Sequence, residues 1–229
     1  MSVGAAALIG GLWAAFAGTH VWLSSQRTRA ALIGRIGGQG FQGLYSVVAL
    51  ATFVPLVWIF ATHKHAGPWL WTTIGPAAVA RPLNHLLMGA AFVLFLVSLL
   101  PSSTAPSAMQ ARGPAVAHGM LRITRHPMLV AFALFGIAHL LVNGSLGDVL
   151  FFGGFPVFAW IGARHQDARK LREIPDYAPL VATTSIVPFA AIVSGRQRLI
   201  AGELPLAALV AGVVVTVVVR VYHGTLFGP

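Results

Sequence analysis

The sequence contains no cysteine, which excludes disulfide bonds, thiolate nucleophiles, iron–sulfur clusters and cysteine-based zinc sites. It also has little charge: only 9% of its 229 residues are Asp, Glu, Lys or Arg, against roughly 25% in ordinary soluble proteins. Hydrophobic residues make up 57% of the chain. So few charges cannot solubilise a globular domain of this size, and the composition therefore predicts an integral membrane protein.

Acidic residues are scarcer than basic ones. Five Asp and Glu stand against 15 Lys and Arg, which gives a net charge of +10. A basic balance can indicate nucleic-acid binding, but here the cations lie in short connectors between apolar runs. Membrane proteins use cations at such places to hold orientation and to meet anionic lipid. We therefore expect the lipid bilayer, and no nucleic acid, as the partner.

Apolar runs recur along the chain, and a spanning helix needs about 20 mostly apolar residues. They predict an all-α integral membrane protein, a bundle of about six transmembrane helices that forms a single transmembrane domain over residues 1–229. The fourth and fifth runs are short, which suits helices enclosed in a bundle. The runs are 3–23, 41–62, 83–100, 127–143, 149–163 and 204–221.

Two stretches between the runs have a different character. The run "IVPFAAIV", 186–193, is too short to cross and contains Pro188, so it predicts an interfacial or re-entrant segment packed on protein. The stretch "PSSTAPSAMQARGPA", 101–115, is rich in Ser, Pro and Ala and predicts a loop.

The cations predict the orientation. Twelve of the 15 lie in the first, third and fifth connectors, and three lie elsewhere, so these three connectors are expected to face the cytoplasm. With six spans, both ends then face outward, as in a multi-pass protein of the bacterial inner membrane. No cation precedes Arg27, so we expect the first run to be a retained helix and not a cleaved signal peptide.

Two histidines lie inside predicted spans, His20 late in the first and His139 deep in the fourth. Each is preceded by aromatic residues at distances of four and seven positions, which share its helix face. An imidazole above two aromatic rings suits a flat, metal-bearing macrocycle, but it also suits a structural histidine or a step in a proton path. The preceding aromatic residues are Trp13 and Phe16 in the first helix, and Phe132 and Phe135 in the fourth.

The residue types narrow the choice of metal site. Zinc is bound by His together with Cys or carboxylates, and here the carboxylates lie in connectors or at span ends. A haem needs only one or two histidines, and Arg122 and Arg125 could meet its propionates. His126 precedes Pro127 at a predicted helix start, where free N–H groups favour an anion or a cofactor carboxylate; an interfacial helix cap fits equally well.

Several motifs in order resemble the NnrU family, which includes the plant zeta-carotene isomerases. They are "GTHVWLSS" (18–25), "LIGRIGGQGFQGLYSVVALATFVPL" (32–56), "RITRHPMLVAFALFGIAHLL" (122–141) and "TTSIVPFAAIVSGRQRL" (183–199). The resemblance covers about residues 10–200 and leaves out an extra C-terminal helix near 204–221. It implies a membrane protein related to a b-haem isomerase.

The resemblance also implies roles for particular residues. The proposed axial ligands of the family fall on His20 and His139, and other family histidines fall on His63 and His126. His63 is therefore expected as a reserve ligand; independently of the resemblance, His85 is a second reserve, because its predicted depth is near that of His139. Bacterial members are associated with denitrification and nitric oxide metabolism. The plant enzymes carry Cys three positions before the inner histidine, where this chain has Gly136, so a mechanism that needs a thiolate there does not apply.

A weaker resemblance points to another class. "RHP" before a helix, followed by "DYAPLVATTSIVPF" (176–189), is similar to isoprenylcysteine carboxyl methyltransferases and phospholipid methyltransferases, which use S-adenosylmethionine. Their paired glutamates should stand near 166–170, where this chain reads "QDARK" and offers only Asp167.

The functional expectation is a haem b-binding membrane protein. It would perform redox chemistry or isomerisation on a lipophilic substrate, or act in denitrification and nitric oxide metabolism. The alternatives are a membrane methyltransferase and a non-enzymatic transporter or assembly factor whose histidines brace the bundle.

Overall fold

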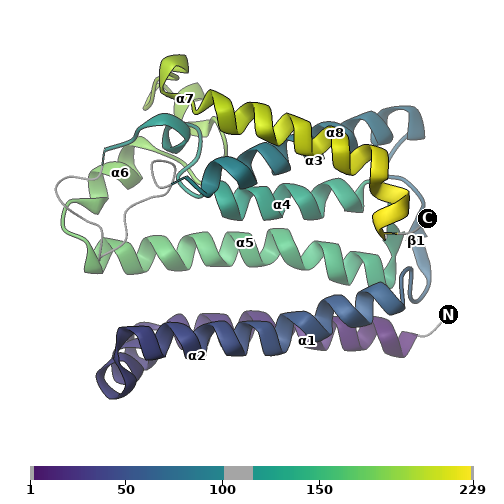
Figure 1. Ribbon diagram of the computed structural model, residues 1–229, viewed down its shortest axis with the longest axis horizontal. Coiled ribbons are helices and arrows are strands. Elements are labelled where there is room, and N and C mark those ends of the chain that lie inside the picture. Colours follow the sequence, from purple (N-terminus) through teal and green to yellow (C-terminus); the bar gives the residue numbers. More distant parts are fainter. Residues whose placement is uncertain (1–2, 101–115, 228–229) are drawn as a thin grey trace. The chain divides into compact units, whose positions relative to one another are not determined.

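The computed structural model describes residues 3–100 and 116–227 of the chain, and most of these residues are helical (Figure 1). The predicted loop 101–115 lies outside the described residues. The elements, in chain order, are α1 (Val3–Ser24), α2 (Gln26–Thr62), β1 (Trp69–Trp71), α3 (Ala77–Ser98), the 3₁₀ turn η2 (Gly119–Arg122), α4 (Pro127–Leu140), β2 (Gly144–Ser145), α5 (Leu146–Glu173), α6 (Tyr177–Thr183), α7 (Ala190–Val193), the 3₁₀ turn η3 (Ala201–Glu203) and α8 (Leu206–Phe227).

Five of the described helices, namely α1, α2, α3, α5 and α8, are long and apolar enough to cross a bilayer. The all-α membrane class predicted from composition is therefore confirmed. The remaining predicted span, 127–143, corresponds to α4, which has 14 residues and would measure about 21 Å. It is a short apolar helix, so the structure does not confirm a count of six.

Helix α5 is longer than the sequence predicted. The apolar run 149–163 is part of a helix of 28 residues that continues through a charged segment to Glu173. The prediction followed the apolar run, but helix geometry continues wherever backbone hydrogen bonds can still form. Pro156 lies inside α5; it lacks an N–H group and so leaves the carbonyl of Phe152 without its usual helical donor.

Contacts divide the chain into two compact units, residues 1–81 with 139–158, and residues 82–138 with 159–229. In the first unit, α1 and α2 form an antiparallel hairpin, seen in Figure 1 as the purple and dark blue helices. The first half of α5 runs parallel to α1, because Gly10 lies beside Leu150 and Trp13 beside Gly154.

One end of the first unit is closed by a short antiparallel β pairing, in which Trp69 pairs with Ser145. Here α5 begins with a reciprocal cap: the Asp148 amide donates to the Ser145 hydroxyl at 3.1 Å, and the Ser145 amide donates to the Asp148 carboxylate at 3.2 Å. This capping box satisfies two backbone donors at the helix start. The same carboxylate lies 2.8 Å from Nδ1 of His65, which ties the turn after α2 to α5.

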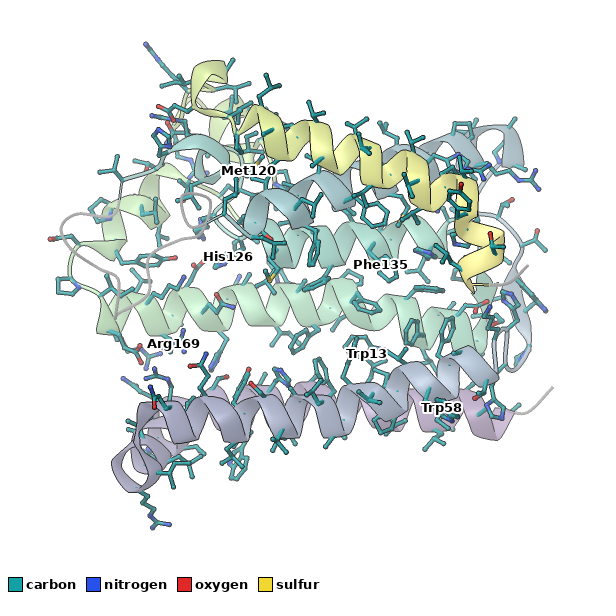
Figure 2. The ribbon with its side chains drawn as sticks, viewed as in Figure 1. Trp13, Trp58, Met120, His126, Phe135 and Arg169 are labelled. Atoms are coloured by element: carbon teal, nitrogen blue, oxygen red, sulfur yellow. The ribbon has the colours of Figure 1, made fainter. Side chains whose placement is uncertain are left out.

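The second unit contains α3, α4, the second half of α5 and the helices that follow. Its core cluster includes Met120, labelled in Figure 2, together with Val97 and Val130. Helix α8 approaches α3 closely at Gly212, where a Cβ atom would lie 2.6 Å from the Cα atom of Val93.

The segment 186–193 does not form a spanning element. Phe189 has a left-handed backbone (φ 63°) and caps the single turn α7. Its amide donates to the carbonyl of Ile123 at 3.0 Å. This backbone hydrogen bond holds the segment within the second unit. Pro188 and the turn at Phe189 interrupt helix geometry and so prevent a longer helix here.

Candidate functional site

His20 lies in an aromatic cluster of the first unit. Its ring centroid is 4.2 Å from that of Phe16, 4.8 Å from that of Tyr45 and 5.5 Å from that of Phe158. Nδ1 lies 3.1 Å from the carbonyl oxygen of Phe16, one turn earlier. Because a carbonyl only accepts, this contact requires Nδ1 to carry the proton. In the neutral ring, Nε2 then holds the free lone pair.

Trp13 extends this cluster toward α5, as Figure 2 shows. Its ring centroid lies 5.6 Å from that of Phe16 and 5.0 Å from that of Phe155. Its indole N–H donates to the carbonyl of Phe151 at 2.9 Å. The ring rests on Gly154, where an added Cβ would lie only 2.2 Å from an indole carbon. A buried hydrogen bond and the absence of a side chain at Gly154 thus fix the indole in place.

The sequence prediction named the aromatic residues of α1 but missed those of α5. Phe151, Phe155 and Phe158 recur at intervals of four and three residues and so share one helix face. In the structure this face meets α1, since Trp13 contacts the first two and Phe16 the third. The spacing was readable in the sequence, but no histidine marked it.

His139 contacts a different face of α5. Its ring stacks on that of Phe152, with centroids 4.4 Å apart and an interplanar angle of 14°. Phe152 and Phe158, which contacts His20, are six residues apart. This separation corresponds to about 9 Å of rise along α5 and to roughly 120° around it. The two histidines thus flank one helix at different depths.

Phe132 and Phe135, predicted to line the face of His139, lie on α4. The ring of Phe132 contacts that of Phe95 on α3 at 6.0 Å and is 38% exposed. Phe135 is half-buried and is labelled in Figure 2. The reserve ligands differ from His20 in being exposed, His63 at the end of α2 and His85 near the start of α3.

His126 belongs to a buried polar network in the second unit, centred on Asp167 of α5. Its Nε2 lies 2.8 Å from Oδ1 of Asp167. Arg125 donates from Nε to Oδ2 at 2.8 Å and approaches it through Nη2 at 2.7 Å. The Tyr177 hydroxyl donates to Oδ1 at 3.1 Å. Burial and the neighbouring carboxylate raise the pKa of Tyr177 above its ordinary value, so the phenol stays protonated and remains a donor.

This network clamps three segments together. It joins the residues just before α4, the end of α5 and the start of α6. A buried carboxylate with several donors is well compensated, and removing one partner would leave a charge buried. The sequence predicts Arg125 and His126 as residues that bind an anion or a cofactor carboxylate. In the structure the side chains of both bond to Asp167, which the sequence pointed to only through the resemblance to methyltransferases.

Arg122 also has an internal partner. Nε and Nη2 donate to the two carboxylate oxygens of Glu203 at 2.7 and 2.8 Å, and Nη1 donates to Gln197 at 2.6 Å. The Gly119 amide donates to Glu203 at 2.8 Å. These donors lower the pKa of Glu203 to about 2. The forked pair ties η2 to η3 just before α8 begins.

The described residues contain no group of three His, Cys, Asp or Glu side chains arranged to hold a metal ion. An isolated ion would therefore lack a ligand set in this part of the chain, whereas a macrocycle that brings its own nitrogens needs only an imidazole. Of the predicted ligands, His20 is the best oriented to bind a metal through Nε2, because its Nδ1 already donates a hydrogen bond to a backbone carbonyl.

The chain is 30% identical over 189 residues to the chloroplastic 15-cis-zeta-carotene isomerases of Zea mays and of Arabidopsis thaliana. The match covers 80% of this chain and 50% of each relative, so the chain spans about half the length of the curated relatives it matches. No solved structure matches.

The model of the family described as NnrU protein matches residues 7–229. The match extends through α8, so the sequence prediction that the resemblance ends near residue 200 was wrong. Helix α8 packs closely on α3 at Gly212, where an added Cβ would lie 2.6 Å from the Cα atom of Val93. The chain is a multi-pass membrane protein that belongs to the NnrU family.

Proposed function

We propose that this protein is an isomerase that acts on a lipophilic substrate in the bilayer and that uses haem b held by His20 and His139. The observation that carries the proposal is the setting of His20: a fixed tautomer within an aromatic wall. The relatives at 30% identity are named as zeta-carotene isomerases, which favours a long, apolar, unsaturated substrate.

The residues around His20 fit such a cofactor. A metal-binding histidine commonly donates its second N–H to a carbonyl, which orients the ring and raises the basicity of the ligand nitrogen. His20 makes this bond to Phe16. This hydrogen bond makes His20 the ligand best supported, with His139 as its predicted partner.

Haem iron in this setting would supply a Lewis acid or a one-electron donor. The chain's own residues prepare the surroundings. Trp13 and Phe16, both buried, exclude water from one side of His20. The Trp13 hydrogen bond to Phe151 keeps the wall rigid, and rigid apolar walls suit a substrate that enters from lipid. Gly136 offers no thiolate, so the activity proposed here does not depend on one.

The proposal places α1, α2, α3, α4, α5 and α8 across a bacterial inner membrane, with the start of α1 and the end of α8 facing outward. The distribution of cations, 12 against three, supports this orientation through the positive-inside rule.

A methyltransferase is not proposed. Its cofactor would need an acidic partner near 166–170, and the carboxylate of Asp167 is already bonded to Arg125, His126 and Tyr177. A role in nitric oxide metabolism and a bracing role for the histidines are the alternatives that the following experiment separates.

The cofactor is tested by absorbance. The chain is produced with ample haem supply and purified in detergent, and a Soret band that shifts on addition of dithionite is expected. His20→Ala and His139→Ala should lose most of the band. His63→Ala should keep it, because His63 is exposed and bonded only within its own helix end. Colourless wild-type protein would contradict the haem and favour a bracing role.

The reaction is tested separately. Reconstituted protein is incubated with 15-cis-zeta-carotene, and the isomers are resolved by chromatography. Conversion that depends on His20 supports the isomerase. A haem protein that converts no polyene but whose spectrum changes with nitric oxide would favour the nitrogen-oxide role instead.

A further inference from the structure

The helix labelled α2 is too long to be one span. Its 37 residues would measure about 55 Å, whereas the hydrocarbon core of a bilayer is about 30 Å thick. The backbone resolves this excess at Gly37, which has non-helical angles (φ 73°, ψ 170°). Residues 38–62 suffice to cross, at about 37 Å, so residues 26–36 form a separate short helix at the end of the span.

This short helix, 26–36, has two distinct faces. Arg27, Ala31 and Arg35 follow one another at four-residue intervals, so they form a single row along the helix. All three are exposed. Leu32 and Ile33 lie about 100° and 160° around the helix from Ala31, the centre of the row, and are half-buried. The short helix thus presents a basic row outward and keeps Leu32 and Ile33 partly buried.

The basic row has no partner within its own part of the chain. The first acidic residue in the sequence is Asp148, and its carboxylate bonds to His65 and to the start of α5. Among the described residues, no hydrogen bond or ion pair involves the side chain of Arg27 or Arg35. Arg29, on the other side, lies 5.7 Å from the ring of Phe41.

The depth of the basic row in the membrane limits which negatively charged groups can contact it. It directly follows α1 and precedes the span 38–62, so it lies at the level where lipid headgroups begin. Anionic phospholipids are the negative charges present at that level, and each nearby Lys or Arg strengthens attraction to them. An amphipathic helix with a basic outer row is the form that lies in this interface.

We propose that the helix 26–36 is a binding surface for anionic phospholipid headgroups, with Arg27 and Arg35 as the residues that contact the phosphates. The break at Gly37 lets this helix leave the direction of the span and lie in the interface. The proposal concerns the surface of the first unit and does not depend on the cofactor or on the reaction.

The test compares two double variants of equal charge change in the full chain. Arg27→Gln/Arg35→Gln removes the basic row. Lys64→Gln/Arg81→Gln removes two exposed cations outside this helix. Purified protein in detergent is titrated with phosphatidylglycerol or phosphatidylcholine, and bound lipids are counted by native mass spectrometry.

Wild-type protein should retain phosphatidylglycerol in preference to phosphatidylcholine. The row variant should bind phosphatidylglycerol more weakly, by roughly fivefold for each arginine removed. The control variant should bind it as the wild type does. An equal loss of phosphatidylglycerol binding in both variants would mean that only net charge matters. No loss in the row variant would mean that the row contacts water or an acidic protein and not lipid. Either result overturns the proposal.

A second measurement covers the case in which detergent masks the lipid. The chain has no cysteine, so Ala31→Cys gives a single site for a nitroxide label in the middle of the row. In vesicles of mixed phosphatidylcholine and phosphatidylglycerol, the label should report headgroup depth by its relative exposure to oxygen and to a soluble nickel chelate. A label that behaves as in bulk water, with or without phosphatidylglycerol, contradicts the proposal.

Discussion

Gly154 is the residue whose size most directly determines the aromatic wall. An added methyl would overlap the Trp13 indole, 2.2 Å away, and that indole is held by its bond to Phe151. We expect Gly154→Ala to destabilise the protein by about 1–3 kcal/mol, as overpacking does. The measurement is the midpoint of unfolding in detergent, followed by tryptophan fluorescence.

Gly153 supplies the matched control, since an added Cβ there meets nothing within 4 Å. Gly153→Ala should leave the midpoint unchanged or raise it, because alanine favours helix by about 1 kcal/mol over glycine. Equal midpoints for the two variants would show that the indole moves aside freely, against the packing described.

Asp167 determines the stability of the clamp around His126. Asp167→Asn keeps the shape of the side chain but leaves the buried Arg125 guanidinium, which is 8% exposed, without its counter-charge. We expect a loss on the order of 3–5 kcal/mol in unfolding free energy. Glu173→Gln is the control: its contact with Arg169 is 3.8 Å long and partly exposed, so it should cost about 0–1 kcal/mol. Similar losses of unfolding free energy in both variants would contradict the prediction that the buried network contributes more than an exposed ion pair.

At the scale of elements, the link between η2 and η3 predicts a dependence on pH. The folded pKa of Glu203 is about 2, below the ordinary value of 4.5. A depressed carboxyl pKa contributes stability that is fully present above the unfolded value and is lost as pH falls toward the folded one. The wild type should therefore lose stability between about pH 5 and pH 2 through this pair.

The check compares unfolding midpoints of the wild type and Glu203→Gln over this pH range. The difference between the two proteins should be largest near neutral pH and should shrink as pH falls. A difference that stays constant with pH would mean that the carboxylate is not ionised in the folded state or that the pair contributes nothing.

At the scale of the whole molecule, the number of crossings determines where the two ends lie. Helix α4 runs antiparallel to α5, since His126 meets Asp167, Leu129 meets Gly162 and His139 meets Phe152. Along its length, α4 therefore lies beside the part of α5 between Asp167 and Phe152. We expect α4 to cross, which makes six crossings and places the start of α1 and the end of α8 on the same side.

The prediction is checked by single-cysteine labelling in this cysteine-free chain. Gly4→Cys and Thr225→Cys should both react with a membrane-impermeant maleimide from outside intact cells, and Gln26→Cys should react only after lysis. Opposite accessibility of the two end positions would mean five crossings, with α4 held within the membrane. Reaction of both ends only after lysis would reverse the orientation.

The amino-acid sequence alone determined the class of the protein, its membrane partner and the helix face that carries Trp13, Phe16 and His20. Composition and helical periodicity are local properties of the chain, so they do not depend on which helices pack together. The sequence also carried the family motifs, although the match continues past the predicted limit through α8.

Only the tertiary structure decided which groups meet. The pairing of Asp167 with Arg125 and His126, and that of Arg122 with Glu203, join residues 41 to 81 positions apart. No local pattern encodes such distances. Hydropathy likewise did not predict the break at Gly37 or the continuation of α5 to Glu173. Apolar runs indicate which residues lie in lipid, whereas packing and hydrogen bonding determine where a helix bends or ends.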